Sequence, residues 1–205
     1  PVLSAMGHQC CPIPTAILSN HTEFPVYFFD DYTEKMTTYT DKWKELGLSF
    51  DAIATGFLGS EAQIGIVMEI VQKLKAEKTF VVVDPVMGDH GHAYETYTPE
   101  MCEQMKELVC MADVVLPNVT ECCILTDTPY REENWTRKEL LNMAMMLRLM
   151  GAKSVVITGV REGSCYTNVV LEQGQYDAKF IRTRSSGGER PGTGDVFSSV
   201  VARRR

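Results

Sequence analysis

Short apolar runs alternate with amphipathic helical patterns through the middle of this chain, and this alternation restricts the fold more than any other feature. Residues 79–83 (TFVVV) form a continuous apolar run of the kind found in strands that are buried on both faces. Similar runs occur at 52–55, 114–116 and 154–158, with helical patterns between them. Strands and helices that alternate at this spacing form right-handed crossovers, so we expect a three-layer α-β-α fold with a mostly parallel central sheet.

Capping signals mark the starts of the predicted helices. Ser60 and Gln63 have the spacing of a capping box, and an apolar stripe over residues 64–74 follows them. Thr136 and Glu139 have the same spacing and begin a second helical pattern, which a glycine closes at position 151.

The pattern changes after residue 163. Two predicted strands at 164–171 and 175–182 are joined through a Gln-Gly pair, so we expect an antiparallel hairpin to end the sheet. The aromatic and acidic segment 26–33 fits neither a core strand nor a helix, and we interpret it as a small flap over the sheet edge. We expect residues 1–205 to form one domain that lacks flanking structure at both ends.

Composition narrows the classes of partner. A formal net charge of −7 argues against a general nucleic-acid binder. There is no run of eighteen apolar residues and no signal-peptide pattern, so we expect no membrane association. Seven cysteines without any C-x-x-C spacing favour reduced core thiols and a cytoplasmic location. His90 and His92 form an H-x-H pair that is more typical of a solvated loop than of a metal site.

Residues 191–197 (PGTGDVF) contain the strongest anion-binding signal in the chain. A Gly-Thr-Gly turn that leads into a helix leaves backbone N–H groups pointing at one small volume, at the positive end of the helix dipole. Asp195 falls in the first helical turn, where a carboxylate can take a proton from an alcohol that attacks phosphorus. The segment predicts a phosphoryl-transfer centre, and the alternative is an ordinary glycine turn with an acidic residue that complements the dipole.

Oxygen-rich side chains follow the predicted strands. Asp84 and Asp89 come after strand 79–83, and two carboxylates separated by a tight turn suit hydrated Mg²⁺. Asn118 and Glu121 follow the next strand. In a functional role Asn118 lies near phosphate and Glu121 near the metal, and the structural alternative for the pair is a capping box. Thr158 is the last residue of the predicted strand 154–158. Its hydroxyl either binds phosphate or belongs to an ordinary β-branched strand residue. Ligands of parallel α/β sheets bind beyond these carboxyl ends.

Six motifs in order along the chain now indicate a family. The segments DPVMGD at 84–89, PNVTE at 117–121, VVITG at 155–159 and GTGD at 192–195 together resemble the ribokinase superfamily. SNHT at 19–22 and TGFLG at 55–59 narrow the resemblance to its pyridoxal kinase branch.

This resemblance implies ATP-dependent phosphorylation of the 5′-hydroxymethyl group of pyridoxal, pyridoxine or pyridoxamine by a homodimer. It implies that Asp195 is the catalytic base and that the amides of Gly192, Thr193 and Gly194 form an anion hole. The implied cofactors are ATP and Mg²⁺, with a monovalent cation as a further candidate. The carboxylates that would arrange Mg²⁺ and its waters near the nucleotide are Asp84, Asp89 and Glu121.

The resemblance also implies which residues contact each of the two substrates. Asn118 and Thr158 match contacts to the nucleotide phosphates, whereas Thr22 matches a contact to the pyridine ring of the vitamer. Phe57 takes a position where related kinases carry a ring-packing aromatic, commonly tyrosine, and core packing is its alternative role. Residues 90–97 contain the glycine expected of a mobile lid, or form a static surface loop.

Two rival functions stay open. A hydroxymethylpyrimidine kinase of thiamine synthesis uses a similar site on a similar small aromatic alcohol. A non-catalytic vitamer-binding protein would keep the fold without chemistry, but a pure binder needs no base, so the presence of Asp195 beside Asp84 and Asp89 favours an enzyme. From the resemblance we expect the family's first strand and the helices after Asp195 to lie outside these residues.

Overall fold

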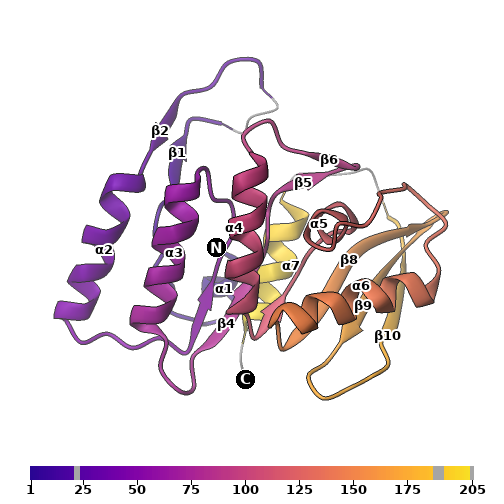
Figure 1. Ribbon diagram of the computed structural model, residues 1–205. Coiled ribbons are helices and arrows are strands. Elements are labelled where there is room, and N and C mark those ends of the chain that lie inside the picture. Colours follow the sequence, from indigo (N-terminus) through magenta and orange to yellow (C-terminus); the bar gives the residue numbers. More distant parts are fainter. Residues whose placement is uncertain (21–23, 187–191, 204–205) are drawn as a thin grey trace.

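A six-stranded sheet forms the centre of the protein in a computed structural model that describes residues 1–20, 24–186 and 192–203 (Figure 1). Its strand order is β10-β9-β8-β7-β4-β3. The strands are β3 (Ala52–Ala54), β4 (Phe80–Val83), β7 (Val114–Val115), β8 (Ser154–Glu162), β9 (Cys165–Leu171) and β10 (Lys179–Arg184). The first four run parallel, and β9 and β10 are antiparallel to their neighbours. The predicted sheet and its C-terminal hairpin are confirmed.

Helices cover both faces of this sheet, which confirms the three-layer prediction (Figure 1). Because strand side chains alternate, Val81 and Val83 enter a large core with α3, α4 and α6, whereas Val82 enters a smaller core with α1 and α7. The helices are α1 (Val2–Ala5), α2 (Thr33–Glu45), α3 (Glu61–Leu74), α4 (Pro99–Cys110), α5 (Val119–Leu125), α6 (Arg137–Met150) and α7 (Thr193–Ala202).

Strand β8 is longer than predicted. Its pairing with β9 shifts register between Ile157 and Val160, and Gly159 has a φ of +69°. This irregularity lets the strand continue to Glu162 past the predicted end at residue 158. Thr158 therefore lies inside the strand rather than at its end.

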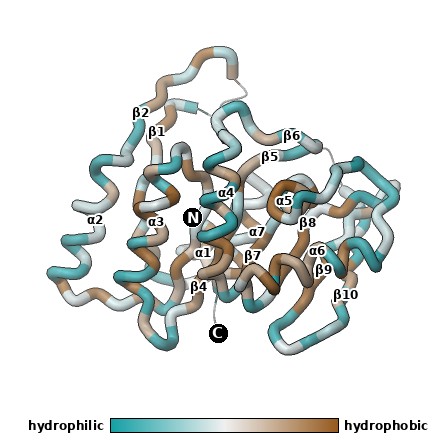
Figure 2. The backbone as a smooth tube through the Cα atoms, in the orientation of Figure 1, coloured by the Kyte–Doolittle hydropathy of each residue, from teal (hydrophilic) through white to brown (hydrophobic). Residues whose placement is uncertain are grey.

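A separate two-stranded ribbon lies outside the main sheet. Strands β1 (Ala16–Leu18) and β2 (Phe29–Asp31) pair antiparallel, so part of segment 26–33 is a strand after all. Its partner is the preceding strand, and no alternating apolar pattern in either segment indicates the pairing. Figure 2 shows apolar residues at the exposed tip of this ribbon, where Val26 is 81 % exposed.

The capping predictions have different outcomes. Thr136 and Glu139 form a complete capping box at α6. Ser60 accepts a hydrogen bond from the Gln63 amide N–H at 3.2 Å, but the Gln63 side chain turns away from the helix start, so the second half of the box is missing. The seven cysteines are free, and only Cys122 and Cys123 are buried. Among the described residues no helix has the length and apolar character needed to cross a bilayer.

Two leucines on α6 provide a matched test of this packing. Leu147 is 0 % exposed and Leu149 is 87 % exposed. We expect Leu147→Ala to lower the free energy of unfolding by about 2–5 kcal/mol, because the cavity adds to the lost transfer free energy. Leu149→Ala should stay within about 0.5 kcal/mol of the parent in the same urea titration. Equal losses in both variants would contradict the placement of α6.

Candidate functional site

The carboxyl ends of the parallel strands meet at one edge of the sheet. Asp84 directly follows β4, and Phe57 follows β3. Asn118 follows β7 and forms an isolated parallel bridge with Thr158 of β8, whose backbone N–H donates to the Pro117 carbonyl at 2.9 Å. The edge therefore carries residues from four neighbouring strands.

Glu121 fixes the ends of β4 and β7 relative to each other. Its side-chain oxygens accept hydrogen bonds from the backbone N–H groups of Met87 at 3.2 Å and Asn118 at 2.7 Å. The Asn118 side chain accepts from the Glu121 N–H at 2.9 Å and donates to the Gly88 carbonyl at 2.8 Å. The structural alternative for this pair, a capping box, is thus present. Both oxygens of Glu121 are engaged with backbone, which makes Glu121 a support for the site.

Helix α7 brings Asp195 to the same edge. The helix contacts β3 and β4, and the Ser198 side chain bonds with Asp84. Burial, and next the negative charge of Asp195, raise the pKa of Asp84 to about 6, although the Ser198 hydrogen bond lowers it. Asp84 and Asp195 therefore lie close enough to repel each other.

The start of α7 has the geometry of an anion site. Gly192 is the N-cap residue with a left-handed φ of 85°, and among the described residues no side chain caps the helix. The N–H groups of the first turn, including those of Thr193 and Gly194, have no carbonyl partner within the helix and point beyond its end. The positive end of the dipole favours a negative ligand there.

A small hairpin covers one side of the edge. Strands β5 (Gly88–Asp89) and β6 (His92–Ala93) pair antiparallel within the segment predicted as a lid or a static loop. The Gly91 N–H donates to Thr120 Oγ1 at 2.9 Å, and a Cβ at Gly91 would lie 2.4 Å from the Tyr130 ring. The hairpin is therefore packed on α5. Asp89 is exposed and accepts from the His90 N–H at 2.8 Å.

Negative charge accumulates at this edge, as the pKa shifts of two groups indicate. Burial is the main cause that raises the pKa of Glu121, and Asp84 and Asp89 raise it further. The pKa of Tyr94 is raised as well. Burial is again the main cause, and the same carboxylates add to it. Tyr94 belongs to the segment predicted as a lid or a static loop. A divalent cation fits such a field, and Asp84 and Asp89 are the carboxylates that could hold it. The described part of the chain contains no cluster of three or more His, Cys, Asp or Glu residues with metal-binding geometry, so water would have to supply most ligands.

The residues predicted to contact the vitamer come from the segment between β1 and β2 and from the turn after β3. Phe57 is partly exposed, and its carbonyl accepts a hydrogen bond from Thr15 Oγ1 at 3.0 Å. Ser19 and Asn20 lie on the ribbon, whereas Thr22 falls outside the described residues. The ribbon therefore reaches the β3 end of the edge through Thr15.

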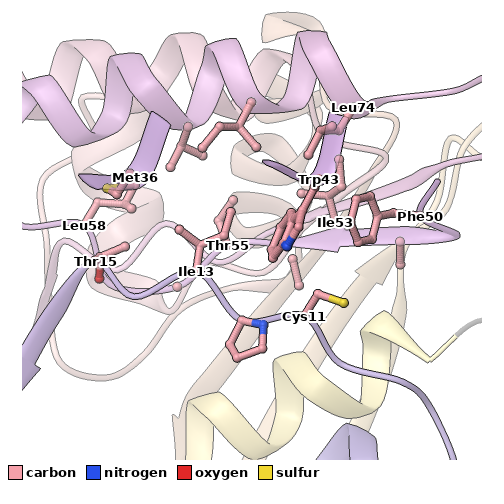
Figure 3. A pocket seen from close by; sticks show the side chains of 16 residues that line it. Cys11, Ile13, Thr15, Met36, Trp43, Phe50, Ile53, Thr55, Leu58 and Leu74 are labelled. Carbon is pink, nitrogen blue, oxygen red and sulfur yellow. The ribbon is translucent and has the colours of Figure 1, made fainter. Parts of the chain in front are cut away.

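An apolar cavity of about 310 Å³ lies beside β3 (Figure 3). It runs from Phe50 and Leu74 at one end to Thr15 and Leu58 at the other. None of the predicted carboxylates lines it, so we locate the candidate site at the strand ends and not in this cavity.

The sheet order, the two helical layers and the strand-end site define a kinase-type α/β protein with a ribokinase-like fold. The chain belongs to the phosphomethylpyrimidine kinase family, which matches residues 2–204. Its resemblance to pyridoxal kinases is also confirmed. It is 31 % identical over 164 residues to a Caenorhabditis elegans protein assigned as a pyridoxal kinase, with 75 % of this chain and 48 % of that protein covered. The chain thus spans about half the length of this relative.

Two solved structures share the fold. A Bacteroides thetaiotaomicron protein assigned to the phosphomethylpyrimidine kinases, crystallised with pyridoxal, is 38 % identical with a TM-score of 0.91, and 98 % of this chain and 71 % of that chain are covered. Pyridoxal kinase from Leishmania donovani, in complex with ADP and pyridoxamine, is 25 % identical with a TM-score of 0.75. In that comparison 93 % of this chain and 70 % of the other are covered.

Because the pKa of Asp84 is raised to about 6, the free energy of unfolding should depend on pH, and this dependence can be measured in cation-free buffer. A folded carboxyl with a raised pKa holds a proton that the unfolded chain has lost, so its contribution to the free energy of unfolding falls as pH rises from about 4 to about 6. We expect Asp84→Asn to remove this fall and to raise the free energy of unfolding at pH 7 by about 1–3 kcal/mol.

Denaturant titrations between pH 4.5 and 7.5 measure this effect. Asp51→Asn, at an exposed position away from the strand ends that carry Asp84, is the matched control. Its free energy of unfolding should change with pH as that of the parent protein does. An unchanged slope in Asp84→Asn would show that Asp84 does not titrate in this range.

Proposed function

We propose that the protein catalyses ATP-dependent phosphorylation of the 5′-hydroxymethyl group of pyridoxal, pyridoxine or pyridoxamine. The observation that carries the proposal is the position of Asp195, in the first turn of α7 and close enough to Asp84 to raise its pKa. A base and an anion site are thereby adjacent at the sheet edge where ligands of parallel α/β folds bind. Residues 1–205 would act as one ribokinase-like kinase domain.

The chemistry assigned to this chain is proton removal and charge stabilisation. Asp195 accepts the proton of the vitamer hydroxyl as its oxygen attacks the γ-phosphorus of ATP, and the bond from phosphorus to the bridging oxygen breaks to release ADP. The amides of Gly192, Thr193 and Gly194 stabilise the negative charge on the transferred group. Asp84 and Asp89 would hold Mg²⁺ through its waters, with Glu121 behind them, and the ion supplies charge neutralisation at the phosphates.

The two substrates approach from different parts of the edge. Asn118, which follows β7, and Thr158 of β8 are proposed to face the nucleotide phosphates. Phe57 and Thr22 are proposed to contact the vitamer ring. The side chain of Asn118 is already engaged at both ends, which supports a role as a positioning element for the phosphate-binding backbone. We further propose a cytoplasmic homodimer.

A hydroxymethylpyrimidine kinase is the second candidate, and the family that matches the chain favours it. Both substrates are small aromatic alcohols, and the proposed base and anion site serve either. The SNHT and TGFLG segments, and the structural relative that was crystallised with pyridoxal, support the vitamin B6 substrates.

Substitution of the proposed base tests the mechanism. We expect Asp195→Ala to lower kcat by about 10²–10⁴, because general-base catalysis is lost, while the Kd for pyridoxal stays within about threefold. Release of ADP and fluorescence titration of pyridoxal measure the two quantities. Asp51→Ala, an exposed aspartate away from the edge, should behave as the parent protein does. Equal turnover in Asp195→Ala and the parent would remove the base assignment.

A substrate panel separates the candidates. We expect ADP release with pyridoxal, pyridoxine or pyridoxamine to exceed that with hydroxymethylpyrimidine by at least about tenfold in kcat/KM, because the ribbon and Phe57 are assigned to the pyridine ring. The reverse order would favour the pyrimidine kinase. Binding of pyridoxal without ADP release, in folded protein with Mg²⁺ present, would favour a non-catalytic vitamer-binding protein.

A further inference from the structure

We propose that Gln63 is a positioning residue for the vitamer side of the site, where it fixes the β1–β2 ribbon against the turn that carries Phe57. The inference rests on the proposed function and extends it to a residue that contacts neither substrate. Gln63 lies in the first turn of α3 and is 0 % exposed.

The buried amide of Gln63 joins three separate segments of the chain. Its Oε1 accepts a hydrogen bond from the Gly59 N–H at 2.8 Å, in the turn after β3. Its Nε2 donates to the Thr15 carbonyl at 2.8 Å, at the start of β1, and to Thr33 Oγ1 at 2.9 Å, just after β2. Asp31 accepts a longer bond from the same nitrogen at 3.4 Å. Both ends of the ribbon and the Phe57 turn therefore meet on one side chain.

The ribbon needs such a tie because it does not belong to the main sheet. Its ladder consists of three residue pairs, and a two-stranded hairpin of this size is marginally stable in water. A second bond supports the same junction, since Thr15 Oγ1 donates to the Phe57 carbonyl at 3.0 Å. The orientation of the ribbon relative to Phe57 thus depends on a few side-chain bonds and not on a continuous ladder.

Helix capping does not account for this glutamine. A Gln at this position would complete the capping box by bonding to the Ser60 N–H, and in this protein its side chain bonds to the ribbon and to Gly59 instead. Buried amide groups without partners destabilise a fold. Replacement of Gln63 would leave the Gly59 N–H without its acceptor, and the Thr15 carbonyl would keep only the bond from the Tyr32 N–H at 3.1 Å. The local consequence falls on the ribbon and the Phe57 turn.

The nucleotide side does not share these bonds. Asn118 and Thr158 are held by Glu121 of α5, Gly88 of β5 and Pro117 after β7. Loss of the Gln63 amide should therefore weaken vitamer binding selectively. A general loss of stability would not distinguish between the two substrates.

Steady-state kinetics of Gln63→Met test the inference, because methionine retains length and apolar bulk but removes the amide. We expect the KM for pyridoxal to rise about tenfold, with kcat and the KM for ATP within about twofold of the parent. Thr15→Val, which removes only the hydroxyl bond to Phe57, should raise the same KM by about threefold and covers the case in which Gln63→Met does not fold. Thr136→Ala, which removes the N-cap of α6, is the stability control and should leave all three constants unchanged.

Hydrogen exchange gives a readout that is independent of turnover. Amides of residues 16–20 and 24–31 should exchange faster in Gln63→Met than in the parent, while those of α6 keep their rates. Unchanged pyridoxal KM and unchanged ribbon exchange in Gln63→Met would overturn the inference, as would equal rises in both KM values. Absence of vitamer turnover in the parent protein would instead refute the proposed function, and the exchange rates would still decide the structural role of Gln63.

Discussion

The carboxylate of Glu121 is the interaction on which the arrangement of the strand ends depends. It is 4 % exposed and accepts backbone hydrogen bonds from Met87, after β4, and from Asn118, after β7. A buried charge of this kind is unfavourable unless it is fully bonded, and its hydrogen bonds hold two loops in one geometry. Asp84, Asn118 and the β5–β6 hairpin take their places around it. The structural and functional roles that the sequence allows for Glu121 are therefore compatible.

Local signals were sufficient to predict the central layers of the fold. The β-branched run before Asp84 and the capping box at Thr136 each depend on residues within a few positions, and both elements form as expected. The strand-end rule for parallel sheets then placed Asp84, Asn118 and Thr158 at one edge without coordinates. The position of Asp195 close to Asp84 was expected from the family resemblance and from the pattern of the helix start.

Contacts between distant segments were not predictable in the same way. Strand β2 pairs with β1 across residues 19–28, and its aromatic, acidic composition carries no strand period. The extension of β8 depends on a bulge at Gly159, which resembles an ordinary turn in sequence. Gln63 had the spacing of a capping residue, and only the folded chain reveals that its amide serves the ribbon. The two sides of the candidate site thus differ in how far sequence alone specifies them.

The protonated state of Asp84 below about pH 6 has a consequence for any cation that binds beside it. Such an ion competes with hydrogen ions for the same oxygens, so its association expels protons into the solvent. Acidification then weakens the affinity of the ion. Heat measured in buffers of different ionisation enthalpy would count the protons expelled per ion.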